Sequence, residues 1–150
     1  MAVDVLRQSV AEFQEGHLER LAGKAAEPMN RITGGRWKQL TLDSDFVPHV
    51  VDDDGRSFDS ESLSQGTRDQ LHLSLRLALV DSIFGDAGPP LLVDDVLVNC
   101  DAVRLDLIRK TFEGEVARGR QMLLFSHDPA YAAWGGTTIR LKGAAPALVG

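Results

Sequence analysis

The sequence predicts an α/β fold made of an N-terminal helix, a small antiparallel meander, a long apolar helix and a parallel strand–helix–strand unit. Three patterns predict it. Apolar residues alternate over 36–42 and recur in two further short segments at 46–51 and 56–58. They recur at helical spacing over 65–85 and 102–118, and form short continuous runs at 91–93 and 122–125. The first pattern is typical of strands, the second of helices, and the third of strands in a parallel sheet.

Composition limits the size and the setting of this fold. The 150 residues are 43% hydrophobic and 25% charged, which suits one core, so we expect one domain or a piece of one. A net charge of −6 argues against a broad nucleic-acid-binding face. Cys100 is the single cysteine and no apolar run is long enough for a membrane span, so we expect a cytoplasmic chain without a membrane.

The N-terminal stretch, residues 1–30, reads as one helix with a narrow apolar seam. The seam contains Val3, Leu6, Val10 and Phe13 and continues after a phase shift near Gly16. Pro28 predicts that the helix stops or bends nearby. Two interpretations stay open: a helix packed on the domain's own core, or the end of a coiled-coil arm entering a globular head.

Strand signals follow. Residues 36–42 alternate, residues 46–51 form a second strand, and the turn at 53–55 predicts a hairpin into a third strand near 56–58. Pro48 lacks a backbone N–H, so we expect it at an edge or irregular position. This region begins the predicted globular part, residues 31–142.

The long apolar helix is predicted over 65–85. Ser64 is a suitable N-cap, and Gly85 followed by two prolines supplies a stop. Apolar residues cover most of its circumference, so we expect this helix to be buried against a sheet.

The strand–helix–strand unit comprises 91–93, a helix over 102–118 capped by Asp101, and 122–125. Its strands should be parallel and covered on both faces, with their carboxyl ends at one edge. Asp94, Asp95 and His127 follow those strands and should therefore meet there. We further expect a short helix near 129–134, a strand at 137–141 and a loose tail at 143–150.

These positions carry candidate chemistry. The start of a helix at Ser64 and Gly66 can receive phosphate, paired aspartates suit hydrated Mg²⁺ and a water to be activated, and His127 can touch a γ-phosphate. Each also has a plainer interpretation: a capped helix, two solvated aspartates and a loop histidine.

Four segments, taken together in their order along the chain, favour the candidate chemistry over these plainer interpretations. They are LSQGTRDQ at 63–70, LLVDD at 91–95, VNCD at 98–101 and SHD at 126–128. They resemble the ABC signature motif, Walker B, the D-loop and the H-loop, and together the chain resembles the C-terminal half, or lobe, of an ABC-type ATPase head of the SMC-like and DNA-repair ATPase superfamily. The signature form is similar to that of the YhaN-like branch.

The resemblance implies roles for the site residues. Asp94 would hold Mg²⁺, Asp95 would orient or activate the attacking water, and His127 would contact the γ-phosphate of ATP in its own subunit. The residues that would act across a head-to-head homodimer are Ser64, Gln65 and Gly66 at the nucleotide, and Asn99 with Asp101 between the two sites.

Two departures from the family pattern matter. Most ABC ATPases have glutamate where this chain has Asp95, which is shorter by one methylene. No Gly-x-x-x-x-Gly-Lys-Ser/Thr loop occurs in the chain. The resemblance therefore implies a partner: a Walker A-bearing N-terminal half, with DNA as a further partner of the full assembly. The alternatives are a non-catalytic interaction module that binds through its N-terminal helix and, more weakly, a Mg²⁺-dependent phosphoesterase.

Overall fold

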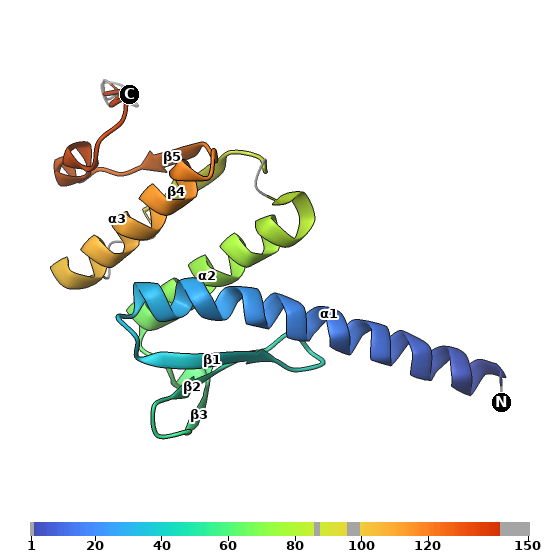
Figure 1. The fold of residues 1–150 in the computed structure, drawn as a ribbon. Coiled ribbons are helices and arrows are strands. Elements are labelled where there is room, and N and C mark those ends of the chain that lie inside the picture. Colours follow the sequence, from blue (N-terminus) through green and yellow to red (C-terminus); the bar gives the residue numbers. More distant parts are fainter. Residues whose placement is uncertain (1, 86–87, 96–99, 142–150) are drawn as a thin grey trace, which may run out of the picture.

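A computed structural model gives the fold of the chain and describes residues 2–85, 88–95 and 100–141, with side chains from Gly16 onward. The chain forms two packed units, one after the other in the sequence (Figure 1). A long helix lies on a three-stranded meander, and a second helix joins this unit to a two-stranded parallel sheet. The predicted mixed α/β class, with its meander and parallel pair, is confirmed.

The meander is built from β1 (Trp37–Leu42), β2 (Pro48–Asp52) and β3 (Ser57–Asp59), paired antiparallel in that order. Trp37, Leu40 and Val50 are buried between this sheet and the first helix. Although β2 is the central strand, Pro48 is its first residue, where a missing N–H interrupts little of the ladder.

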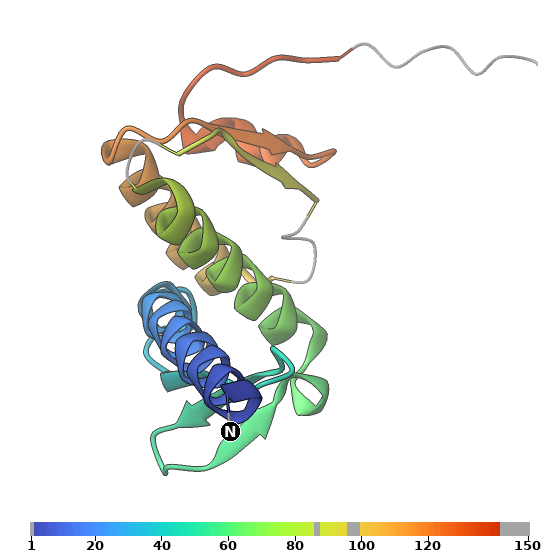
Figure 2. The same cartoon turned by 90° about the vertical axis from the view of Figure 1, so that its right-hand side faces the viewer.

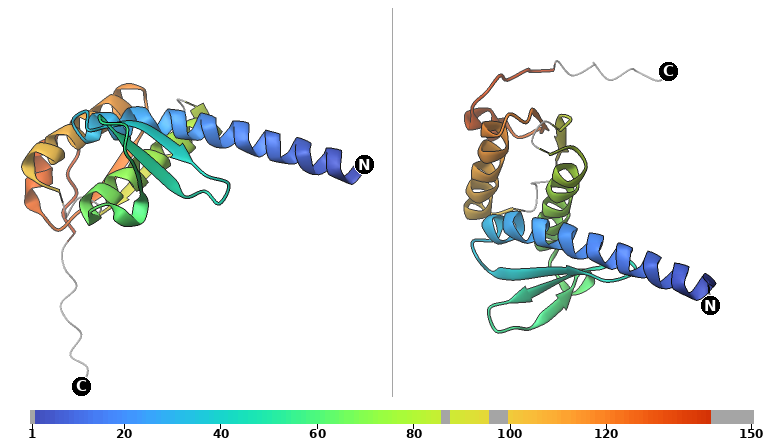
Figure 3. Two further views of the ribbon diagram at one scale, coloured as in Figure 1. Left: turned by 90° about the horizontal axis from the view of Figure 1, so that it is seen from below. Right: turned by 45° about the vertical axis from the view of Figure 1, so that its right-hand side comes forward.

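Helix α1 (Ala2–Ile32) does not stop at Pro28 but continues for one more turn and ends at Ile32. Pro28 removes one backbone hydrogen bond, but Ala25, Met29 and Ile32 around it are almost fully buried, and this packing holds the last turns in place. The amino-terminal part of α1 extends past the rest of the fold (Figure 3). The predicted seam from Val3 to Phe13 lies outside the described side chains.

Helix α2 (Gln65–Phe84) has the predicted caps: the hydroxyl of Ser64 at its start and Gly85, at a φ of +64°, at its end. It joins the two cores, because Leu71 packs with α1 and the meander whereas Leu73 and Leu77 pack with the parallel sheet. The expectation that the whole helix is buried is only partly met. Its last turns expose Leu79, Ile83 and Phe84.

The parallel unit consists of β4 (Leu91–Asp94), α3 (Ala102–Ala117) and β5 (Met122–Phe125), with Leu91 opposite Met122 and Asp94 opposite Phe125. One face of the sheet packs on α3 through Val93. In Figure 2 the sheet lies across one side of α2 and α3. The predicted covering of both faces is wrong, since Leu92, Leu123 and Phe125 are exposed on the other face.

The chain continues into a 3₁₀ helix, η3 (Pro129–Trp134), as predicted, and Trp134 packs edge-on against Phe112 with ring centroids 6.3 Å apart. The predicted strand at 137–141 is wrong: these residues have no strand conformation. A strand needs a neighbour for its backbone groups, and no other strand of the described residues pairs with this segment. The predicted tail at 143–150 lies outside the described residues. None of the helices described here is both long and apolar enough to cross a membrane.

A buried ion-pair network ties α2 to the beginning of β5. Arg120 is 2% exposed and pairs with Asp81 of α2 and Glu115 of α3, while Arg118 pairs with Asp81 from the surface. Arg120 also donates to the carbonyl oxygen of Gly85 at 3.1 Å. The network therefore fixes the end of α2 against the loop that leads into the second strand of the parallel sheet.

This network predicts a loss of stability in acid. Burial alone would raise the pKa of Asp81, but hydrogen bonds from Arg120 and Arg118 outweigh it and the pKa lies below its ordinary value. The folded state thus binds this proton less readily than the unfolded chain, so the contribution is complete above a pH of about 4 and is lost as the pH falls below it. Urea unfolding at pH 7 and pH 3 should show a smaller loss for Asp81→Asn than for the unchanged chain. Asp45→Asn, at an exposed carboxylate, is the control and should keep the full loss.

Candidate functional site

The carboxyl ends of β4 and β5 bring Asp94, Asp95 and His127 to one edge of the sheet. Asp94 is the last residue of β4 and lies opposite Phe125, the last residue of β5. The backbone N–H of Asp95 donates to the carbonyl oxygen of Phe125 at 3.1 Å, which extends the pairing by one step. Asp95 has a φ of +46°, a conformation that is uncommon outside glycine but best tolerated by Asp and Asn. The backbone thus turns sharply at the second aspartate.

His127 lies beside that aspartate. Its Nδ1 is 3.3 Å from Oδ1 and 3.4 Å from Oδ2 of Asp95, so an Nδ1–H can donate to the carboxylate. The His127 side chain is 77% exposed and that of Asp95 48% exposed, so both can be reached from solvent. A short turn holds the histidine, because the N–H of Asp128 donates to the Ser126 hydroxyl and Asp128 caps η3.

The edge fits a cation that keeps much of its water. Asp94 and Asp95 are exposed, and the described residues contain no cluster of three or more side chains able to enclose a metal ion. Mg²⁺ is commonly held by one or two carboxylates together with waters and substrate phosphates. Asp94 and Asp95 meet that requirement, whereas they could not form an all-protein metal cage.

The start of α2 forms a second, separate feature. The Ser64 hydroxyl accepts the N–H of Thr67 at 3.3 Å and lies 2.9 Å from the Thr67 hydroxyl, while the Gln65 amide donates to Asp69 at 2.8 Å. Ser64 and Gln65 are exposed and Gly66 is buried. Ser64 therefore caps α2 as predicted, and the exposed helix start remains accessible to an anion on another molecule.

The beginning of α3 lies close to α2. Asp101 caps α3 by accepting the N–H of Arg104 at 2.9 Å, and Asn99 falls outside the described residues. Gln70 of α2, 1% exposed, places its side-chain N–H₂ 4.0 Å from the Cys100 sulfur. Burial raises the pKa of the Cys100 thiol, and the Gln70 contact opposes that only in part. We did not predict a role for Gln70; a polar residue inside an apolar helical face was the available signal.

The two features are not joined to each other. Among the described residues, no hydrogen bond or ion pair links the start of α2 with Asp94, Asp95 or His127. The chain therefore carries an acidic sheet edge and an exposed helix start as two distinct surfaces.

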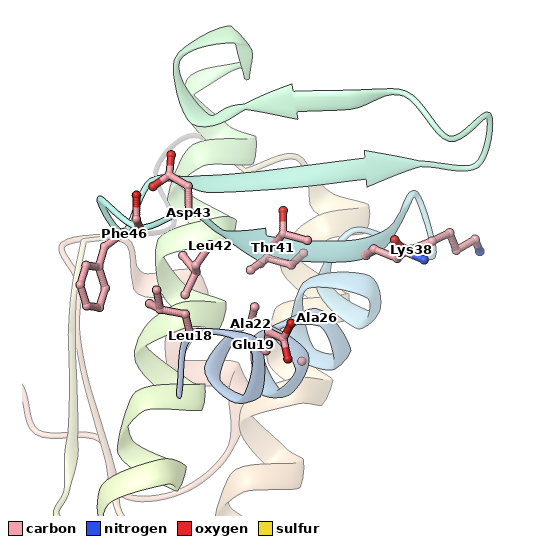
Figure 4. Close-up of a pocket in the computed structure, with 13 residues that line it drawn as sticks. Leu18, Glu19, Ala22, Ala26, Lys38, Thr41, Leu42, Asp43 and Phe46 are labelled. Carbon is pink, nitrogen blue, oxygen red and sulfur yellow. The ribbon is translucent and has the colours of Figure 1, made fainter. Parts of the chain in front are cut away.

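An apolar groove of about 670 Å³ lies between α1 and β1 (Figure 4). Leu18, Ala22 and Leu42 line it, and Phe46, at a φ of +61° and 64% exposed, stands at its rim. None of the predicted site residues lines this groove, so it is separate from the acidic edge.

This arrangement of elements matches solved SMC ATPase heads. One, determined in work on ATP-driven dimerization and DNA-stimulated activation of SMC ATPases, aligns at a TM-score of 0.64 and 14% identity over 83% of this chain and 80% of that one. The Smc head domain derived from Pyrococcus furiosus, with an extended coiled coil and bound ScpA C-terminal domain, aligns at 0.61 and 12% identity over 77% of this chain and 30% of that one. The chain thus has the fold of part of an SMC-type ATPase head.

Sequence relatives agree with that fold. The chain is 32% identical over 130 residues to the uncharacterized protein YhaN of Bacillus subtilis, a match that covers 84% of this chain and 13% of YhaN. It is 28% identical over 142 residues to the DNA double-strand break repair Rad50 ATPase of Halobacterium salinarum, covering 91% of this chain and 16% of that protein. No protein-family model matches. The chain is similar in sequence to these two proteins and spans less than a fifth of the length of each.

Proposed function

We propose that this chain is the C-terminal half of an ATPase head that binds ATP and Mg²⁺ in a head-to-head dimer. The observation that carries the proposal is the meeting of Asp94, Asp95 and His127 at one sheet edge. Two carboxylates and an imidazole at the carboxyl ends of parallel strands suit a site for a phosphorylated ligand.

The three residues divide the work at that edge. Asp94 would hold Mg²⁺, which when bound would supply positive charge to offset that of the phosphates. Asp95 accepts a hydrogen bond from the attacking water and orients it, and its carboxylate is the base available for the proton. His127 contacts the γ-phosphate. Its Nδ1, 3.3 Å from Asp95, also holds the Asp95 carboxylate in place beside the γ-phosphate.

The start of α2 serves the opposite subunit. Ser64, Gln65 and Gly66 contact the γ-phosphate held by the other head, and Asn99 with Asp101 links the two sites. This assignment is supported by the separation of α2's exposed start from the acidic edge of the same chain. Because the start of α2 makes no contact with the acidic edge of its own chain, it is available to contact the γ-phosphate bound at the acidic edge of a partner.

The remaining parts follow from the same proposal. Residues 1–30 are the end of a coiled-coil arm, residues 31–142 are the lobe, and a Walker A-bearing half completes each site. The relationship to a DNA double-strand break repair ATPase supports work on DNA, in repair or chromosome maintenance, by the full assembly.

ATP turnover by the chain alone and after mixing with a Walker A-bearing N-terminal half tests the proposal. We expect phosphate release only in the mixture, and its loss in Ser64→Arg, because an arginine at the exposed helix start blocks the approach of the second head. Silence in every mixture, with the added half folded and ATP-bound, would instead support the non-catalytic interaction module.

A further inference from the structure

A second pocket, of about 360 Å³, opens where α1, α2 and α3 meet. None of the described residues at the acidic edge or at the start of α2 lines it. Pockets for small ligands begin at about 300 Å³, so this one can take a small molecule. Leu77 and Ala78 of α2 give it an apolar wall, and charged side chains from all three helices make up most of the remaining lining.

The two most buried carboxylates of this pocket already have cationic partners. Asp81 and Glu115 each pair with Arg120, which is buried beside the pocket, and with Arg118, which is more exposed. Two carboxylates therefore meet two guanidinium groups. This leaves little negative charge to attract a cationic ligand.

The α1 side of the pocket has an excess of positive charge. Lys24 and Arg31 lie seven residues, or about two helical turns, apart and both line the pocket. Arg31 pairs with Glu27, whereas the Lys24 ammonium contacts the Asp81 carbonyl oxygen at 3.4 Å and no carboxylate of the described residues. The described side chains that line the pocket or pair with its lining comprise four cations and three carboxylates, in a chain whose net charge is −6. An anion would balance this local excess.

Gly114 keeps the pocket open on the α3 side. Glycine is a poor residue for the interior of a helix, and α3 continues on both sides of it. A Cβ at Gly114 would lie 3.6 Å from Nη1 of Arg31, so a longer side chain would enter the space beside that guanidinium. The glycine thus leaves room for a ligand next to Arg31.

We propose that this pocket binds a small organic phosphate. The phosphate lies between Lys24 and Arg31 of α1, Arg118 of α3 adds positive charge, and the organic part packs on the apolar wall of α2. Ammonium and guanidinium groups are the side chains that bind phosphate most strongly. Because the cations come from both α1 and α3, the bound phosphate ties the N-terminal helix to the rest of the fold. The inference is independent of the proposed ATPase, whose residues take no part in it.

Titration of the ¹⁵N-labelled chain with phenyl phosphate, followed by amide chemical shifts, tests the pocket. Saturable shifts are expected in 24–31, 77–81 and 111–118, with weaker binding at higher salt. Lys24→Gln should weaken binding by at least about tenfold, because it removes a charged donor. Lys110→Gln is the matched control: Lys110 pairs with Asp106 on the surface of α3, outside the pocket, so binding should stay unchanged.

A second variant fills the pocket without removing a charge. Gly114→Leu should abolish the shifts while the far-ultraviolet circular dichroism of the chain keeps its helical signal. Benzoate, which has the same ring with a carboxylate, should bind more weakly than phenyl phosphate because it offers fewer acceptor oxygens.

Four results would overturn the inference: no saturable shifts, equal effects of Lys24→Gln and Lys110→Gln, tighter binding of benzoate than of phenyl phosphate, or full binding by Gly114→Leu. Shifts confined to 64–67 would also overturn it, since they would place the phosphate at the start of α2. A short DNA duplex that shifts 24–31 where phenyl phosphate does not would assign these cations to nucleic acid instead. ATP turnover judges the proposed function separately.

Discussion

Replacing Asp95 by Asn in an assembled head is expected to lower ATP turnover by about 10²–10⁴-fold. The amide has nearly the same shape but has no negative charge and cannot accept the proton of an attacking water. It also weakens the attraction to His127, whose Nδ1 lies 3.3 Å from the carboxylate. Steady-state phosphate release measures the effect, and nucleotide affinity should change little because Asp94, the proposed Mg²⁺ ligand, is unchanged.

Asp106→Asn is the matched control. Asp106 is a carboxylate on the surface of α3, paired with Arg109 and Lys110, and lies outside the proposed site. Turnover by Asp106→Asn should equal that of the unchanged head. If Asp95→Asn kept turnover within twofold of this control, the assignment of Asp95 as the residue that activates water would be wrong.

The limits of helices and turns were predicted correctly where they depend on residues close together in the sequence. The limits of α2 follow from the Ser64 hydroxyl and from Gly85, and the hairpin between β2 and β3 follows from Gly55 at a φ of +77°. Where the outcome depends on distant partners, prediction failed. Pro28 stays helical because neighbouring residues are buried, and 137–141 is not a strand because no strand of the described residues pairs with it.

The site divides in the same way. Parallel strands joined by a helix place their carboxyl ends together, so the meeting of Asp95 and His127 could be predicted from order alone. The Gln70–Cys100 contact and the Asp81–Arg120 pair join residues 30 and 39 positions apart. No periodicity marks such pairs, since they depend on how α2 and α3 pack.

Arg120→Ala is expected to lower the free energy of unfolding by about 3–5 kcal/mol, because it removes the buried cation of an ion-pair network. Arg120 is 2% exposed, and its loss leaves Asp81 and Glu115, whose side chains are 21% and 10% exposed, with the more exposed Arg118 as their remaining cationic partner. It also removes the donor to the Gly85 carbonyl oxygen that ends α2. Urea unfolding followed by circular dichroism at pH 7 gives the change.

Arg109→Ala is the control that tests whether the loss of stability depends on burial of the arginine or only on its number of ion pairs. Arg109 pairs with Asp106 and Glu113 on the surface of α3, where water screens the charges, so its removal should leave stability nearly unchanged. Both substitutions delete an arginine with two acidic partners, and they differ mainly in access to water. Equal losses in the two variants would mean that the Arg120 network does not hold α2 against the start of β5. The apolar packing of Leu73 and Leu77 against Val93 of β4 would then be what joins α2 to the parallel sheet.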